Sequence, residues 1–255
     1  MIRSCLVLLV LSLTTETGAE ERSPVLLELF TSEGCSSCPP ADAALERLVR
    51  SQAVFGAEII PLALHVDYWN RLGWADPFSS ADFSRRQEEY SQAFGGDRVY
   101  TPQMVVDGSK EFVGDESGGI KWVAAASKQP KTRMEMELSP RCDRSPGVSL
   151  SVAPVSIASS GDVPELFVAL TESGLVSNVA RGENAGRVLR HTAVVRQLRS
   201  LGEINKTASS SRTAKLSVEK DWKKGAIQVV AFVQEKRSRR ILGAVARPLC
   251  DAAPR

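Results

Sequence analysis

The sequence has few of the features that mark membrane proteins and nucleic-acid-binding proteins. Its N-terminal apolar run, residues 5–13, is nine residues long, which is too short to span a bilayer. The formal net charge is only +2, so no excess of one sign indicates nucleic acid or an anionic membrane as an obligatory partner. Aromatic residues are sparse, with 3 Tyr, 4 Trp and 8 Phe, which leaves few platforms for stacking on bases.

The composition that remains is that of a globular protein. The 255 residues are 43% hydrophobic and 24% charged, a balance typical of folded proteins and not of disordered or collagen-like chains. This length suffices for one large domain or two ordinary ones. Five cysteines are present, and their placement is the more informative feature.

The N-terminus has the pattern of a signal peptide. Arg3 gives a positive start, residues 5–13 are apolar, and Thr17-Gly18-Ala19 offers the small residues that signal peptidase requires. We therefore expect cleavage of residues 1–19 and a mature protein that is periplasmic or secreted. Cys5 lies at the front of the apolar run and not at the cleavage point, so we expect no lipoprotein anchor and no transmembrane span in the mature chain.

Export gives the remaining cysteines a chemical meaning. Disulfides form and exchange in oxidising compartments. The mature chain holds four cysteines, which permit three pairings. They are Cys35, Cys38, Cys142 and Cys250.

Net charge and the pattern of apolar runs divide the mature chain into two parts. Residues 20–130 hold 10 Lys and Arg against 17 Asp and Glu, a net charge of −7, whereas residues 131–255 hold 21 against 12, a net charge of +9. The first part alternates apolar runs with helical patterns, and the second is a series of short β-rich runs. We therefore predict two domains, residues 20–130 and 131–255.

The first part opens with a strand, a turn and a helix. Residues 25–30 are mostly apolar and predict a buried strand, after which Cys35-Ser36-Ser37-Cys38 precedes a helical pattern. Pro39-Pro40 is compatible with the first turn of that helix, where backbone N–H groups lack partners. Residues 59–66 form a second apolar run, so the order predicts a βαβ unit with a parallel pair of strands.

Further along, the pattern predicts a helix, a hairpin and a closing helix. A helix is expected from Ser79 to about residue 94, with Asp82 in its first turn. Thr101-Pro102 then precedes two short β runs that flank Asp107-Gly108, which is a strong hairpin signal. A last helix is expected over residues 117–127.

These motifs together resemble the thioredoxin superfamily over roughly residues 24–129. The resemblance implies that Cys35 is the attacking thiol, that Cys38 is the resolving thiol, and that Pro102 is a cis-proline facing the pair. More narrowly, the chain resembles a bacterial family of secreted thioredoxin-like proteins of unknown function. The motifs that carry this second resemblance are Glu28-Leu29-Phe30-Thr31-Ser32, Cys38-Pro39-Pro40, His65-Val66-Asp67-Tyr68-Trp69 and Tyr100-Thr101-Pro102-Gln103.

The position of the cysteine pair favours reactivity. A free cysteine has a pKa near ~8.5, and the start of a helix can depress that pKa to roughly 3.5–7.5 in motifs of this kind. Glu33 should oppose the thiolate of Cys35. Glu28, an acidic residue in an apolar strand, has two interpretations: a proton acceptor for Cys38, or a structural residue bonded to backbone or an arginine.

Metal binding is the main alternative for this motif. Thiolates favour Cu(I) or Zn, and His65 would supply a third ligand beside Cys35 and Cys38. A lone histidine at a strand end more often makes a simple hydrogen bond, and His191 is expected to be structural. The cluster Tyr68, Trp69, Trp74 and Phe78 is compatible with partial burial in the core or with a docking surface.

The second part predicts about eight short strands and hence an antiparallel β-sandwich. Cys142 and Cys250 lie near its two ends, so we predict a structural disulfide between them, with a second redox pair as the alternative. The basic runs of this part are typical of solvated turns, and a patch formed by them is compatible with contact to the acidic first part or to anionic envelope components.

The sequence thus predicts an α/β thioredoxin-like N-terminal domain followed by an all-β sandwich-like C-terminal domain. The expected activity is thiol–disulfide exchange by Cys35 and Cys38 with an exported protein or a small thiol, without a bound cofactor and without nucleic acid. The alternatives are a periplasmic copper or zinc chaperone and a non-catalytic envelope interaction protein in which the Cys35–Cys38 bond is permanent.

Overall fold

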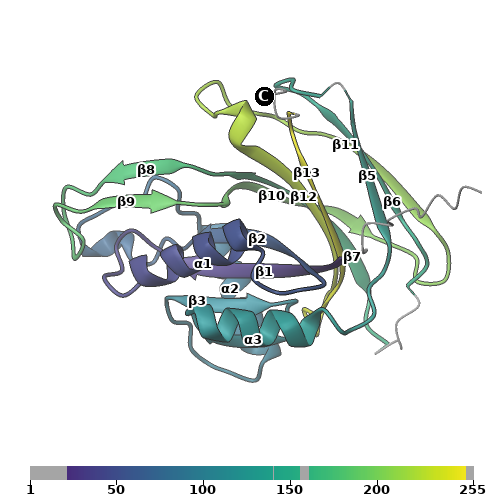
Figure 1. The fold of residues 1–255 in the computed structure, drawn as a ribbon, viewed down its shortest axis with the longest axis horizontal. Helices are drawn as coiled ribbons and strands as arrows, with labels where there is room; N and C mark the ends of the chain where they lie inside the picture. The colour runs from purple at the N-terminus through teal and green to yellow at the C-terminus, as the bar shows by residue number, and fades with distance from the viewer. Residues whose placement is uncertain (1–21, 140, 156–160, 251–255) are drawn as a thin grey trace, which may run out of the picture.

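The computed structural model describes residues 22–139, 141–155 and 161–250 (Figure 1). The predicted signal peptide, residues 1–19, lies outside the described residues. Within the described part of the chain, no helix is long and apolar enough to cross a membrane.

One large mixed sheet dominates the molecule. It has eight strands in the order β13-β12-β7-β10-β2-β1-β3-β4. Its strands are β1 (Ser23–Thr31), β2 (Ala57–His65), β3 (Gln103–Val106), β4 (Lys110–Val113), β7 (Pro164–Glu172), β10 (Val194–Glu203), β12 (Ile227–Glu235) and β13 (Ile241–Pro248). Strand β1 runs parallel to β2 and antiparallel to β3, so the sheet changes direction around β1.

Smaller elements cover and extend this sheet. A three-stranded sheet has the order β11-β6-β5, and a separate pair, β8 with β9, projects beyond the main sheet (Figure 1). These strands are β5 (Met134–Ser139), β6 (Gly147–Val152), β8 (Leu175–Asn178), β9 (Val188–His191) and β11 (Ser210–Lys215). The helices are α1 (Pro39–Ser51), α2 (Ala81–Ala93) and α3 (Glu116–Ala126), with short 3-10 turns η1 (Asn70–Leu72) and η2 (Lys224–Ala226).

The predicted fold class is wrong. The described residues are mostly β, with three α-helices beside the large mixed sheet, and they do not form a helix-flanked thioredoxin-like α/β domain joined to a separate sandwich. Four strands from beyond residue 130 continue the sheet that β1 to β4 begin. The two parts are joined where β10 pairs with β2, at Val194 opposite Ala63, and where the Ala63 N–H donates to the Ala193 carbonyl at 2.8 Å.

The boundary at residue 130 stays a prediction from the sequence. In the structure, strands from both sides of this residue share one sheet. The turn between β3 and β4 also contacts the other part closely. A Cβ at Gly108 would lie 1.9 Å from the Arg239 carbonyl oxygen, and its φ of +60° also favours glycine. The neighbouring Asp107 accepts from the Leu26 N–H at 2.9 Å and pairs with Lys131.

Several local predictions are confirmed. Strands β1 and β2 pair in parallel on either side of α1 in the chain, as the βαβ pattern required. Asp107-Gly108 turns β3 into β4, and both residues have positive φ. Helix α2 begins at Ala81, two residues after the expected Ser79, because Ser80 is its N-cap and accepts from the Asp82 N–H.

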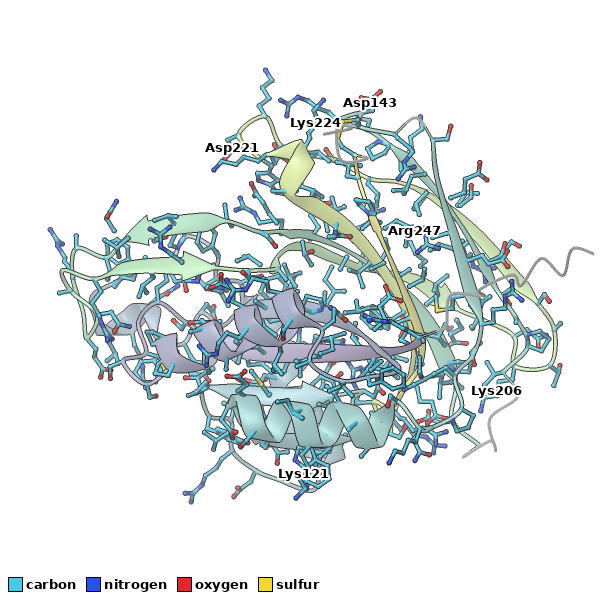
Figure 2. All side chains as sticks on the ribbon, viewed as in Figure 1. Lys121, Asp143, Lys206, Asp221, Lys224 and Arg247 are labelled. Atoms are coloured by element: carbon cyan, nitrogen blue, oxygen red, sulfur yellow. A yellow bond between two sulfur atoms is a disulfide. The ribbon has the colours of Figure 1, made fainter. Side chains whose placement is uncertain are left out.

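Alternate residues of β1 face different cores. Leu27 and Leu29 pack with α1 and α3, whereas Leu26 and Phe30 pack on the face that α2 covers. A third core lies between the three-stranded sheet and β7, β12 and β13. Charged side chains such as Lys121, Asp143 and Arg247 project from the outside of the molecule (Figure 2).

A disulfide closes this third core at one end. Cys142 and Cys250 are bonded, although 108 residues separate them. The Cys142 N–H also donates to the Leu249 carbonyl at 3.0 Å, so the segment before β6 is held against the end of β13. A cross-link over a loop of this length stabilises the fold by about 4–5 kcal/mol in the chain-entropy treatment.

A buried ion pair connects α2 to the sheet. Arg86 donates from Nε to Glu28 at 2.7 Å and from Nη1 to the Gln234 side chain on β12 at 2.9 Å. The Tyr90 hydroxyl donates to the second carboxylate oxygen of Glu28. All four residues are fully or almost fully buried, so this network joins the two sequence parts through groups that water cannot satisfy.

We expect Arg86→Met to lower the free energy of unfolding by about 3–5 kcal/mol, because Glu28 would then retain a buried charge without its partner. Denaturant titration measures the change. The double variant Glu28→Gln/Arg86→Met removes both charges and should recover part of the loss. A double variant as unstable as Arg86→Met alone would contradict this explanation.

Candidate functional site

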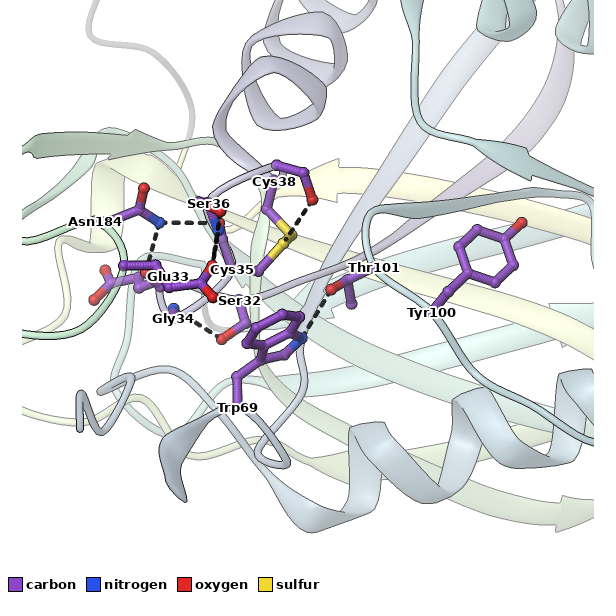
Figure 3. The surroundings of a disulfide bond; sticks show 12 residues. Ser32, Glu33, Gly34, Cys35, Ser36, Cys38, Trp69, Tyr100, Thr101 and Asn184 are labelled. Carbon is purple, nitrogen blue, oxygen red and sulfur yellow. Dashed lines mark hydrogen bonds between the residues drawn. A yellow bond between two sulfur atoms is a disulfide. The ribbon is translucent and has the colours of Figure 1, made fainter. Parts of the chain in front are cut away.

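The cysteine pair lies where β1 leads into α1. Cys35 and Cys38 form a disulfide with an S–S distance of 2.10 Å and Cα atoms 5.4 Å apart (Figure 3). Cys38 is the N-cap residue of α1, and two prolines follow it. Because proline lacks an N–H, the first helical turn begins without unpaired donors at those positions. The N–H groups of Ala41 and Asp42 donate to the Cys38 carbonyl at 2.9 and 3.1 Å.

The pair is buried, although the residues between its cysteines are exposed. Both cysteine side chains have 0% exposure, whereas Ser36 and Ser37 face solvent. The Ser37 hydroxyl lies 3.4 Å from Cys35 Sγ and is placed to donate to a thiolate there. A sulfur with no exposed surface cannot be attacked from solution until a neighbouring group moves.

A segment far away in the sequence packs against this turn. We call residues 175–191, which comprise β8, β9 and their connection, the hairpin arm. Asn184 of the arm donates from Nδ2 to the carbonyl oxygens of Glu33 at 2.8 Å and Cys35 at 2.9 Å (Figure 3). Glu183 accepts from the Ser36 N–H at 3.1 Å and from its hydroxyl at 2.7 Å. Sequence reasoning missed both residues, since nothing local marks them.

Thr101 and the aromatic side chain of Trp69 lie on another side of the pair (Figure 3). The Thr101–Pro102 peptide bond is cis. The Trp69 indole N–H donates to the Thr101 hydroxyl at 2.8 Å (Figure 3). A Cβ at Gly34 would lie 3.0 Å from Trp69 Cβ, which is closer than an ordinary van der Waals contact, so a larger residue directly before Cys35 would press on Trp69.

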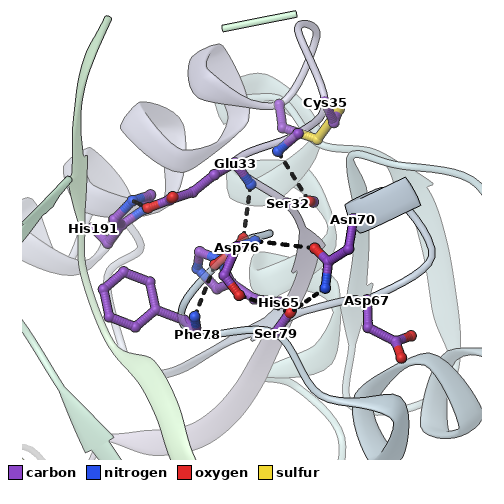
Figure 4. A network of polar contacts seen from close by, with 12 residues as sticks. Ser32, Glu33, Cys35, His65, Asp67, Asn70, Asp76, Phe78, Ser79 and His191 are labelled. Carbon is purple, nitrogen blue, oxygen red and sulfur yellow. Dashed lines mark hydrogen bonds and ion pairs between the residues drawn. A yellow bond between two sulfur atoms is a disulfide. The ribbon is translucent and has the colours of Figure 1, made fainter. Parts of the chain in front are cut away.

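A polar network lies beneath the turn (Figure 4). His65 at the end of β2 and Asp76 are joined by a 2.7 Å contact at Nδ1, and Asp76 also accepts from the Glu33 N–H at 2.8 Å. The Glu33 carboxylate contacts His191 Nε2 at 2.9 Å and accepts from the Trp74 indole N–H at 2.7 Å. We call residues 32–38, which carry Cys35 and Cys38, the redox turn, after the exchange that the sequence predicts. The network therefore joins β2, the redox turn and the hairpin arm.

Burial and charge shift the titration of this network in different directions. Burial alone would lower the pKa of His65, but the charge and hydrogen bond of Asp76 raise it above 6.5. Burial would raise the pKa of Asp76, yet His65 and backbone N–H groups lower it below its usual value. Burial raises the pKa of Asp42, on α1. The charges of His65 and His191 lower it, but by less than burial raises it.

The aromatic cluster has mainly structural contacts. The Phe78 ring meets the rings of His65 and His191 edge-on, with centroids 5.5 Å away in each case. The two imidazoles are themselves 5.0 Å apart. Phe78 thus helps to enclose the histidines, and Trp74 is oriented by Glu33.

Glu28 is not brought to the cysteine pair. It follows Leu26 by two residues and so faces α2, where Arg86 and Tyr90 occupy its carboxylate, whereas α1 covers the opposite face. The contacts of Glu28 match its structural interpretation as the partner of an arginine. No contact among the described residues supports its predicted role as proton acceptor for Cys38.

The alternative metal ligands are also not assembled. Within residues 22–139, 141–155 and 161–250, no group of three or more His, Cys, Asp or Glu side chains is arranged to hold a metal ion. Cys35 and Cys38 are bonded to each other, and His65 uses Nδ1 for Asp76.

His65→Asn should destabilise the protein in a pH-dependent way. Because the pKa of His65 is raised in the folded state, its contribution to stability is complete below pH 6.5 and is lost as pH rises through the folded pKa. The pKa of Asp76 is lowered, so Asp76 remains ionised at every pH above 5. The difference in unfolding free energy between wild type and variant should therefore be largest near pH 5–6, about 3 kcal/mol, and shrink towards pH 9.

Denaturant titrations at several pH values measure this difference. Glu33, Asp42 and His191 also face His65, and both proteins contain them. A difference that stays constant from pH 5 to pH 9 would show that His65 is not held in its charged form.

Comparisons with known proteins place the chain by its fold and family. The crystal structure of a protein from Agrobacterium tumefaciens matches with a TM-score of 0.71 and 24% identity, covering 93% of this chain and 99% of that one. HBP35 of Porphyromonas gingivalis matches with a TM-score of 0.67 and 14% identity, covering 92% and 79%. Both likenesses concern the fold alone.

The comparison with curated proteins found no match. The family described as "Protein of unknown function (DUF1223)" matches residues 26–234, which include the redox turn, the buried network and the hairpin arm. The chain belongs to the DUF1223 family.

Proposed function

We propose that the protein is an exported thiol–disulfide oxidoreductase that acts through Cys35 and Cys38. The observation that carries this proposal is a disulfide closed between two cysteines at the start of α1. The dipole of a helix favours an anion near its N-terminus, so a thiolate at this position is favoured. The motif-level resemblance to the thioredoxin superfamily supports the same chemistry, independently of the overall fold.

The reaction is a two-step exchange. In the reduced protein, the Cys35 thiolate attacks one sulfur of a partner disulfide, and the other partner sulfur leaves as a thiolate and takes up a proton. Cys38 then loses its proton and attacks Cys35 Sγ, which releases the second partner thiol. The partner gains two electrons and two protons while the Cys35–Cys38 disulfide forms, and the reverse sequence oxidises a partner.

The buried state of the disulfide adds a requirement. Cys35 and Cys38 have 0% exposure, so a partner sulfur reaches Cys35 only when the surrounding turn or a covering group is displaced. Trp69 and the hairpin arm contact the turn from two sides. This arrangement favours partners that bind long enough to shift one of these elements over rapid collision with small oxidants.

The location and the partner class are part of the same proposal. The signal-peptide pattern of residues 1–19 supports export to the periplasm or beyond. An exported protein or a small thiol is then the available partner. The Cys142–Cys250 disulfide is consistent with an oxidising compartment, because disulfides form and persist there. Its long loop also makes it a stabilising cross-link.

Cys38→Ser should trap the first step. Without a resolving thiol, the mixed disulfide at Cys35 persists, so incubation with a disulfide-containing protein should give a covalent adduct that a reductant releases. Intact-protein mass spectrometry and non-reducing gels detect it. Cys35→Ser is the matched control and should give no adduct, and its catalysed rate of disulfide reduction should fall to background.

Two results would contradict the proposal. A Cys35→Ser/Cys38→Ser variant with the wild-type exchange rate would show that the pair does no chemistry. A Cys35–Cys38 bond that glutathione and dithiothreitol leave intact in the folded protein would instead support the non-catalytic alternative, in which the bond is permanent.

A further inference from the structure

A carboxylate is held against the residue that follows Cys35, whose sulfur the proposed reaction uses. Glu183 Oε2 accepts from both the backbone N–H and the hydroxyl of Ser36, the residue that follows Cys35. The hydroxyl bond and the backbone bond of Ser36 lower the pKa of Glu183, so its carboxylate is fully ionised at neutral pH. A full negative charge therefore lies at the start of α1, where the helix otherwise favours an anion on Cys35.

The arm that carries this charge is fixed to the redox turn by Asn184. Its Nδ2 bridges the carbonyl oxygens of Glu33 and Cys35, and its Oδ1 accepts from Arg187 Nη1 at 2.7 Å. Asn184 is completely buried, whereas Glu183 is exposed. The buried residue thus determines where the neighbouring carboxylate lies.

The occupied N–H has a chemical consequence. The N–H of Ser36, directly after Cys35, donates to Glu183 in this structure and is therefore not available to a Cys35 thiolate. A carboxylate hydrogen-bonded to the neighbouring residue also disfavours a thiolate on Cys35, because like charges repel. Ser37 acts in the opposite direction, because its hydroxyl is placed to donate to Cys35 Sγ at 3.4 Å.

We propose that Glu183 is a positioning residue that restrains the reactivity of Cys35, by engaging the Ser36 N–H and placing a negative charge beside the thiolate. This inference rests on the proposed function, since it concerns the same sulfur. The hairpin arm, more than 140 positions away in the chain, thereby lowers the thiolate population and makes the protein a weaker oxidant than the helix start alone would make it.

The test uses Glu183→Gln in the full-length mature protein. Glutamine can still accept from Ser36 but carries no charge, and the side chain is exposed, so the fold should be retained. We expect the reduced variant to react with iodoacetamide at Cys35 about threefold faster near pH 7, in line with one solvent-exposed charge beside the thiolate. The ratio of reduced to oxidised protein in a glutathione buffer should rise by a similar factor.

Matched variants separate charge from position. Glu46→Gln removes an exposed charge from α1 at a residue that makes no contact with the redox turn and should leave both measurements unchanged. Glu183→Asp retains the charge and should stay close to wild type. At about 1 M salt, where the screening length falls to about 3 Å, the gap between wild type and Glu183→Gln should narrow.

The outcomes distinguish this inference from the proposed function. Glu183→Gln with wild-type alkylation and glutathione equilibrium would overturn the role of Glu183 while leaving exchange by the pair intact. Faster alkylation in a protein whose wild type forms no mixed disulfide would instead remove the proposed function and keep the effect of the charge. Equal effects of Glu46→Gln and Glu183→Gln would show a general charge effect and would also overturn the inference.

Discussion

The pairing of β10 with β2 is the constraint on which the rest of the molecule depends. Val194 lies opposite Ala63, and the Ala193 carbonyl accepts from the Ala63 N–H. Only a short contact is made, yet it merges strands from the two sequence parts into one sheet. Because the hairpin arm ends immediately before β10, the same contact delivers His191 to Glu33 and the tip of the arm to the redox turn.

The buried polar network has more influence on position than on stability. Buried ion pairs gain little over well-packed apolar groups, because desolvation offsets their attraction. Their directional bonds nevertheless fix geometry, and Glu33 shows this. Its N–H, carbonyl and carboxylate bind Asp76, Asn184 and the pair His191 and Trp74. A residue expected only to oppose a thiolate therefore orients the whole turn that carries Cys35.

Sequence patterns specify what is local in this protein. The βαβ order, the Asp107-Gly108 hairpin and the start of a helix at the cysteine pair all follow from neighbours in the chain. The merged sheet could not be predicted in this way, because nothing in the sequence of β2 indicates that its second edge pairs with β10. The interpretation of Glu28 as a proton acceptor for Cys38 depended on its nearness to the cysteine pair in the sequence. The alternation of side chains along β1 instead turns Glu28 towards α2.

In the structure, ion pairs connect the acidic first part of the sequence to the basic second part. The acidic first part and the basic second part do meet at surface and buried pairs, such as Glu89 with Arg239 at 2.9 Å and Asp107 with Lys131. At the cysteine pair the pattern reverses, because the basic part contributes an acidic residue, Glu183. Net charge per segment thus describes how the two parts associate, but it does not show that a carboxylate of the basic part contacts the turn that carries Cys35.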